Sequence, residues 1–147
     1  MIRSLSAALL LTSLASLAIA QAPATALPRT ASPPGARVYI VNPKDGASIK
    51  GPVTVVFGLS GMGVAPAGVQ AENTGHHHLL IDADIPADTS MPLPATDNIK
   101  HFGKGQTEVT LDLKPGKHTL QLVLGDHLHI PFNPVVASQK ITITVAP

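Results

Sequence analysis

Short apolar runs punctuated by turns constrain the fold of this chain more than any other feature. The runs are rich in β-branched and aliphatic residues, and proline and glycine separate them, as in Pro43-Lys44-Asp45-Gly46 and Gly51-Pro52. Several runs alternate apolar and polar residues, which is the period of a half-buried strand. We therefore expect six strands, at residues 37–41, 53–59, 76–82, 106–113, 118–124 and 140–145.

These strands predict an all-β fold, because no amphipathic helical pattern follows the first twenty residues. Turns at short intervals are typical of an immunoglobulin-like antiparallel sandwich, formed here by residues 36–147 as a single domain. The turn Lys114-Pro115-Gly116-Lys117 predicts a hairpin between the strands at 106–113 and 118–124. A long segment rich in proline and aspartate, residues 83–105, interrupts the pattern, and loops of this length are often functional.

The first residues predict export. Arg3 precedes an apolar stretch from Ala7 to Ala20 that ends in small residues, so residues 1–20 resemble a signal peptide cut after Ala20. No segment has the length and apolarity of a membrane span. Residues 21–35 are mostly Ala, Pro, Ser and Thr, and we expect a disordered linker there. The mature protein is therefore expected in the periplasm or secreted.

The amino-acid composition excludes several kinds of ligand and site. The chain has no cysteine, which removes disulfides and thiolate ligands. Loss of Arg3 with the leader leaves nine basic and nine acidic residues, and a neutral chain without basic clusters argues against nucleic acid. Aromatic residues are 3% of the chain, too few for a sugar- or base-stacking platform. No activated serine motif occurs and no general base stands out, so we expect a binding protein ahead of a metal-dependent enzyme.

All seven histidines lie between positions 76 and 129, and three of them are consecutive. In Gly75-His76-His77-His78-Leu79-Leu80-Ile81-Asp82, side chains alternate if the run is a strand, so His76 and His78 share one face with Leu80 and Asp82. His77 then shares the other face with Leu79 and Ile81. The two histidines of the first face would lie roughly 7 Å apart along the strand, within reach of one metal ion.

A second group of histidines follows the strand at 118–124. His127 and His129 are also two residues apart and come directly after Asp126, and His101 ends the long segment. Imidazole suits copper and zinc, and a carboxylate can bind the metal or orient a ring. The candidate metal ligands are therefore His76, His78, His101, His127, His129 and Asp126, with copper or zinc as the ion. Such a domain would bind, buffer or hand on the metal.

The same histidines have a structural interpretation. Rings at strand ends can hydrogen-bond loop carbonyls, which would make this a non-catalytic interaction or structural domain with an envelope protein partner. His77 would then have a hydrogen-bonded core role, and His118, beside a turn, would be exposed without function. The alternation of residues 120–124, if continued, points His127 and His129 to solvent unless Gly125 introduces a bulge. For a metal site, an ordinary imidazole pKa of about 6.5 predicts loss of the ion on acidification to pH 5.

Three blocks of sequence resemble a known family. They are Asn73–Asp82, then His101–Glu108, and finally His118–Leu122 with Leu124–His129. Together they resemble domain-of-unknown-function family 4399, over roughly residues 60–145. The resemblance implies an exported bacterial domain without an established activity, so it supports localisation and domain limits more than function.

Overall fold

A computed structural model describes residues 28–147; the predicted signal peptide and the first part of the predicted linker lie outside them. The described residues form nine strands: β1 (Arg37–Asn42), β2 (Ser48–Lys50), β3 (Val53–Ser60), β4 (Gly63–Val64), β5 (Thr74–Ile81), β6 (Ile99–His101), β7 (Glu108–Leu111), β8 (Gly116–Gly125) and β9 (Ile141–Ala146). Nothing in this part of the chain is a helix long and apolar enough to cross a membrane.

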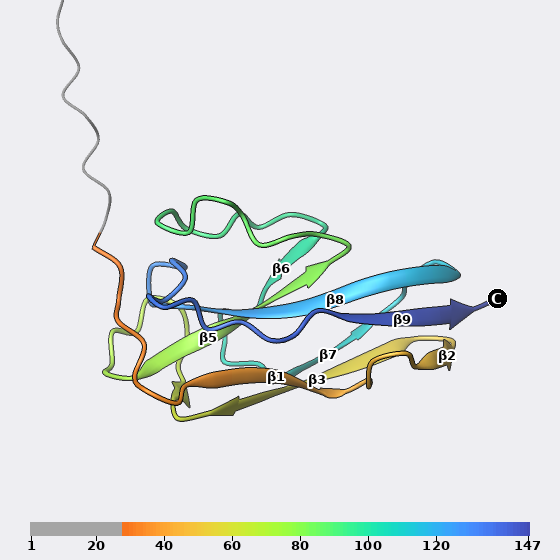
Figure 1. The fold of residues 1–147 in the computed structure, drawn as a ribbon, viewed down its shortest axis with the longest axis horizontal. Coiled ribbons are helices and arrows are strands. Elements are labelled where there is room, and N and C mark those ends of the chain that lie inside the picture. Colours follow the sequence, from red (N-terminus) through yellow and green to blue (C-terminus); the bar gives the residue numbers. More distant parts are fainter. Residues whose placement is uncertain (1–27) are drawn as a thin grey trace, which may run out of the picture.

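The strands form two sheets, with order β1-β3-β7 in one and β2-β9-β8-β5-β4 in the other, where β6 also pairs with β5. Figure 1 shows the two sheets stacked as layers, so the predicted all-β sandwich is confirmed. All six predicted strands are present. The pattern missed β2, β4 and β6, which are only two or three residues long. Two of these pair in parallel, β2 with β9 and β4 with β5, while the other strand pairs are antiparallel.

The predicted hairpin is wrong. β7 pairs with β3 in the smaller sheet, whereas β8 pairs with β5 and β9 in the larger one. The turn at 112–115 therefore carries the chain from one layer to the other. Turn composition fixes a change of direction but not the pairing partner, and here Leu111 and Leu120 reach the same core from opposite sheets.

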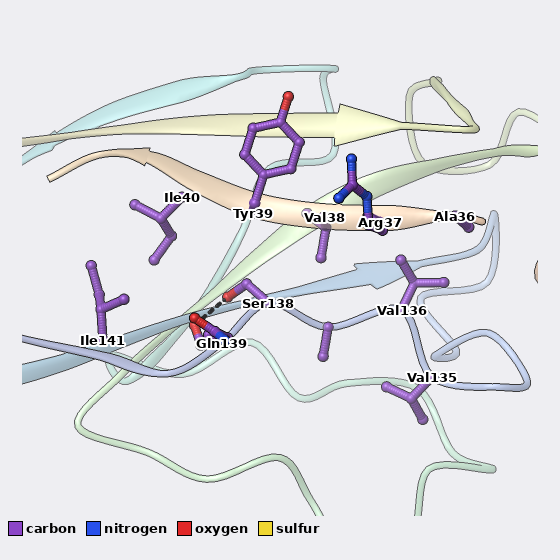
Figure 2. A pocket seen from close by; sticks show the side chains of 11 residues that line it. Ala36, Arg37, Val38, Tyr39, Ile40, Val135, Val136, Ser138, Gln139 and Ile141 are labelled. Carbon is purple, nitrogen blue, oxygen red and sulfur yellow. Dashed lines mark hydrogen bonds between the residues drawn. The ribbon is translucent and has the colours of Figure 1, made fainter. Parts of the chain in front are cut away.

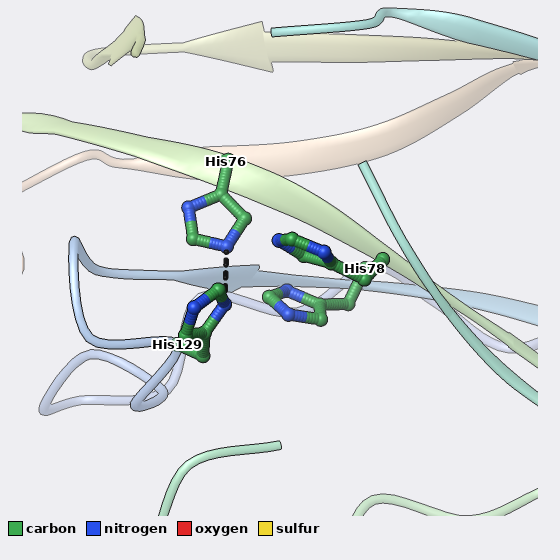
Figure 3. A group of neighbouring side chains, drawn as sticks. His76, His78 and His129 are labelled. Atoms are coloured by element: carbon green, nitrogen blue, oxygen red, sulfur yellow. Dashed lines mark hydrogen bonds between the residues drawn. The ribbon is translucent and has the colours of Figure 1, made fainter. Parts of the chain in front are cut away.

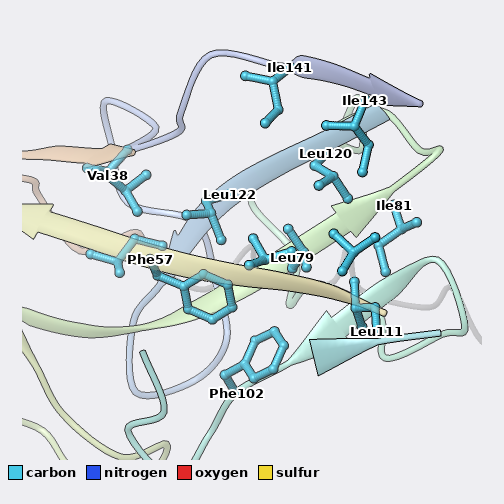
Figure 4. Packing of buried hydrophobic residues seen from close by; sticks show 14 of the residues in the cluster. Val38, Phe57, Leu79, Ile81, Phe102, Leu111, Leu120, Leu122, Ile141 and Ile143 are labelled. Carbon is cyan, nitrogen blue, oxygen red and sulfur yellow. The ribbon is translucent and has the colours of Figure 1, made fainter. Parts of the chain in front are cut away.

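The main core lies between the sheets. Leu79 and Ile81 of β5 face it together with alternate residues of β8, and Val38 and Phe57 close it from the smaller sheet (Figure 4). Each such side chain contributes about 1.5–3 kcal/mol when fully buried. Because the odd-numbered side chains of β5 face this core, the even-numbered ones face outward from the sandwich.

The outward face of the larger sheet is also covered. Leu80 and Val123 form a second cluster with Leu93 and Ile99, and the long segment between β5 and β6 lies over it (Figure 1). His76 and His78 share this face with Leu80. The long segment thus buries one end of the histidine strand on the side away from the main core.

The last part of the predicted linker is not free of the domain. Ala31 bridges Asn133, whose backbone N–H donates to Thr30 O at 2.9 Å and whose carbonyl accepts from Ser32 N at 3.1 Å. We call residues 29–33 the N-terminal strap. The strap adds a short stretch of backbone pairing to the loop that follows β8, and residues 34–36 connect it to β1.

Candidate metal centre

Four histidines converge on the outward face of the larger sheet: His76, His78, His101 and His129. Each can offer a ring nitrogen such that all four nitrogens lie within 4.8 Å of one another. Figure 3 shows His76, His78 and His129 turned toward a common centre. Metal–nitrogen bonds of about 2.1 Å place tetrahedral ligands about 3.4 Å apart, so rings of this group need to approach by roughly 1 Å to hold one ion.

Strand pairing positions three of the four rings. β5 carries His76 and His78 on one face, and β6 places His101 directly opposite His78. Two glycines leave room for these rings. A Cβ at Gly125 would lie 2.7 Å from Cε1 of His78, and a Cβ at Gly103 would lie 2.2 Å from Cε1 of His101. Any side chain at either position would therefore push a ring out of the group.

The fourth ring comes from the loop after β8. His129 adopts a left-handed backbone conformation, with φ of 67°, which turns its side chain back over β5. Its Nδ1 lies 3.1 Å from Nε2 of His76, so one of these two rings donates a hydrogen bond to the other. This contact links strand and loop within the group.

The rings in the interior of the group are neutral at ordinary pH. Burial, reinforced by neighbouring histidines, lowers the pKa of His76 to about 4 and that of His78 to about 3. Partial burial and the ring of His129 also lower the pKa of His101. Among the described residues, Nδ1 of His76 and both ring nitrogens of His78 find no hydrogen-bond partner. A neutral ring carries one N–H and one lone pair, so His78 keeps one buried nitrogen free to bind a metal ion, and so does His76 when its Nε2 donates to His129.

The structure does not bring His127 into the group, although the sequence pairs it with His129. β8 ends at Gly125, so the alternation that would place both rings on one face stops there. His127 instead lines a shallow cleft between the strap and residues 69–74, and its carbonyl accepts from Gly68 N at 3.0 Å.

Asp126 lies beside the group, but other partners occupy its carboxylate. Oδ1 accepts from the backbone N–H of Leu128 at 2.9 Å and of Ile130 at 3.0 Å, and Oδ2 accepts from the hydroxyl of Thr30 at 2.6 Å. Asp126 is 2% exposed. Both carboxylate oxygens are thus engaged in holding the loop, and neither is free to bind a metal ion. The candidate ligands that the structure brings together are all histidines.

His77 faces the main core, as its parity predicts. Its ring lies 5.1 Å from that of Phe57, centroid to centroid, and burial lowers its pKa to about 4. The hydrogen bond expected for it is missing: neither ring nitrogen has a partner within residues 28–147. The triplet is therefore split, with two rings outward and one inward.

The sequence predicts that His118 is exposed and without a role, but the structure gives its ring two hydrogen bonds. Nδ1 lies 2.7 Å from Oδ2 of Asp82 and Nε2 lies 2.8 Å from the Lys114 carbonyl oxygen. These two hydrogen bonds raise the pKa of His118. Partial burial raises the pKa of Asp82, but hydrogen bonds from His118 and Thr119 outweigh it and lower that pKa. His118 thus ties the end of β5 to the turn before β8.

We expect His118→Gln to destabilise the metal-free protein more at pH 6 than at pH 8.5. A pKa above the unfolded value of about 6.5 gives a contribution that is complete below pH 6.5 and is lost as pH rises through the raised pKa. The pair is partly exposed, so the loss at pH 6 should be about 1 kcal/mol or less. Denaturant unfolding at both pH values measures it, and an equal loss at both would contradict the ion pair.

A separate pocket lies between β1 and residues 135–141 (Figure 2). Arg37 and Tyr39 line it on one side and Ser138 and Gln139 on the other. The Ser138 hydroxyl donates to its neighbour's carbonyl, Gln139 O, at 2.8 Å. None of the described residues lining this pocket is a histidine or a carboxylate. The histidine group therefore remains the site with chemistry to offer.

Comparison with known proteins places the chain in context. The family model described as "Domain of unknown function (DUF4399)" matches residues 55–146. No curated protein matches the chain. Among solved structures, an endo-beta-1,4-mannanase from Thermotoga petrophila is similar, with 21% identity over 75% of this chain and a TM-score of 0.42; the match spans 19% of the mannanase chain. Fibronectin(III)-like modules of Clostridium thermocellum CbhA are similar too, with 11% identity, 74% of this chain, 92% of theirs and a TM-score of 0.36. At these scores neither likeness carries an argument about function.

Proposed function

The chain belongs to the DUF4399 family, and we propose that this member binds one transition-metal ion, copper or zinc, through His76, His78, His101 and His129. The observation that carries the proposal is the convergence of four imidazoles, each with a ring nitrogen within 4.8 Å of the others, in a group that includes buried ring nitrogens of His76 and His78 without a hydrogen-bond partner. In the exported setting predicted from residues 1–20, the protein would bind, buffer or hand on that metal.

The polar atoms inside the group favour a metal over a purely structural role. A buried nitrogen without a hydrogen bond costs about 1–3 kcal/mol, and His76 and His78 together bury three such atoms. Histidines that only ordered loops would direct these atoms at carbonyl oxygens, as His118 does with the Lys114 carbonyl. A bound cation would take one nitrogen from each ring, including one of the two unpartnered nitrogens of His78. Bound to Nε2 of His76 and Nδ1 of His129, it would also take the place of the proton that these two rings now share.

The donor set suits copper or zinc. Four imidazole nitrogens without thiolate or free carboxylate match the borderline ions that imidazole binds, and disfavour magnesium and calcium, which need oxygen ligands. The set is also unevenly buried. His76 and His78 are fully buried, while His129 is half-buried and His101 is exposed. The exposed side would be the route by which the ion enters and leaves.

Metal content is the direct test. The untagged protein, expressed with its own leader and recovered from the periplasm, should carry or take up about one copper or zinc ion per chain. Elemental analysis of the purified protein and calorimetric titration of the metal-free form measure this. A polyhistidine tag must be avoided, because it would bind metal itself. Sub-stoichiometric or millimolar binding would leave the histidines as scaffold.

A further inference from the structure

His129 is placed differently from the other three members of the histidine group. His76, His78 and His101 lie on paired strands, whereas His129 lies in the loop Asp126–Ile130 that follows β8. Strand pairing therefore cannot hold its ring at the site. Something else must keep this loop in one conformation if the ring is to face the strand.

Asp126 closes that loop on itself. Its backbone N–H donates to the Ile130 carbonyl and its carbonyl accepts from the His129 N–H, both at 2.9 Å. Its Oδ1 takes two more backbone N–H groups, those of Leu128 and Ile130. One buried aspartate thus makes four hydrogen bonds that bracket His129 and support its left-handed backbone conformation.

The N-terminal strap in turn holds Asp126. The Thr30 hydroxyl donates to Oδ2 at 2.6 Å, the one carboxylate oxygen that the loop leaves free. Backbone pairing between the strap and Asn133 fixes Thr30 in place, and the Arg29 side chain donates to the carbonyls of Pro131 and Phe132. The strap precedes residues 55–146, where the family model matches.

We infer that Thr30 and Asp126 are positioning residues of the metal site: the strap holds the aspartate, and the aspartate holds the loop that presents His129. The inference rests on the proposed function. It reverses the role that the sequence suggests for Asp126, because a carboxylate with both oxygens engaged shapes the site without binding the ion. Groups that hydrogen-bond a metal ligand directly typically change metal affinity by about 10–100-fold when removed; Asp126 acts on His129 through the loop backbone, so we expect an effect at the lower end of this range.

Three substitutions in the full mature chain separate positioning from ligation. Asp126→Asn keeps an oxygen for the two loop N–H groups and an amide that can donate to Thr30, so zinc affinity should stay within about threefold of the wild type. Asp126→Ala keeps the two backbone hydrogen bonds but removes the two that Oδ1 makes to the loop and the one that Oδ2 accepts from Thr30, and should weaken zinc binding about tenfold. Thr30→Val removes only the donor to Oδ2 and should weaken binding severalfold. Ser32→Ala is the matched control, since the Ser32 hydroxyl bonds the exposed Pro134 carbonyl in the same strap and should leave affinity unchanged.

Zinc titrations and the copper(II) paramagnetic resonance spectrum would be recorded for each variant, with the unfolding midpoint of its metal-free form. The inference is supported if Asp126→Asn keeps the nitrogen hyperfine pattern of the wild type while Asp126→Ala and Thr30→Val alter it. It is overturned if Asp126→Asn loses zinc as completely as a ligand would, or if Thr30→Val binds like Ser32→Ala. Should Asp126→Ala fail to fold, the Asn and Val variants still decide. A wild type that binds neither metal rejects the proposed function itself, which distinguishes the two failures.

Discussion

Replacing His76 and His78 together by glutamine should abolish the rise in unfolding midpoint that we expect copper or zinc to give the wild-type protein. A ligand that binds only the folded state adds about 2.7 kcal/mol at a hundredfold excess over its dissociation constant. For a domain of this size that corresponds to roughly 10 °C. His76 and His78 are the two buried members of the histidine group. Without them only His101 and His129 remain, and two ligands bind an ion far more weakly than four.

The measurement is the difference between midpoints with and without metal at pH 7.5, because the substitutions can also change the stability of the metal-free protein. His118→Gln is the control: it removes a histidine that is bonded to Asp82 outside the group, and it should leave the metal-dependent rise intact. A double variant that keeps the full rise would show that the ion binds elsewhere.

Acid should destabilise the metal-free protein by about 4 kcal/mol between pH 7.5 and pH 5.5. His76, His77 and His78 have folded-state pKa values of about 4, 4 and 3, below the unfolded value of about 6.5. Between these limits the unfolded chain binds more protons, so stability falls as pH falls, by about 1.4 kcal/mol for each histidine per pH unit. The loss should continue below pH 5.5 until the folded-state values are reached.

Denaturant unfolding across this pH range gives the slope directly. His77→Phe removes one of the three titrating rings from the main core, so it should reduce the loss by about a third while leaving metal binding unchanged. A stability curve that is flat between pH 7.5 and 5.5 would contradict the burial of neutral rings. The lowered pKa values also revise the expectation from sequence: with less proton competition, metal should be retained at pH 5 better than an ordinary imidazole allows.

The sequence was sufficient for the six longer strands and for the split of the histidine triplet. Both follow from alternation, and the burial of Leu79 and Ile81 confirms the parity that sends His76 and His78 outward. His101 and His129 were among the candidates as well. Their convergence on β5 depends on which strands pair, and the alternation of a single strand does not encode its neighbours.

The errors lie where the chain leaves a strand. His127 was grouped with His129 by spacing alone, but the loop bracketed by Asp126 follows no period of two. The hairpin at Lys114–Lys117 failed because a turn that joins two strands of one sheet has the same composition as one that joins two sheets. The hydrogen bonds of His118 and Thr30 span 36 and 96 residues of sequence, and no local pattern predicts such contacts.

The split triplet has a consequence for folding fidelity. If β5 slipped by one residue against β8, His76, His78 and Leu80 would enter the space between the sheets, and Leu79 and Ile81 would leave it. The space between the sheets would then hold one aliphatic side chain of β5 in place of two and two imidazoles in place of one, and burying polar rings without hydrogen-bond partners is costly. The same pairing sets His78 opposite His101 and His76 opposite Gly125. Core packing therefore destabilises the slipped register, in which the histidine ligands would also be wrongly spaced.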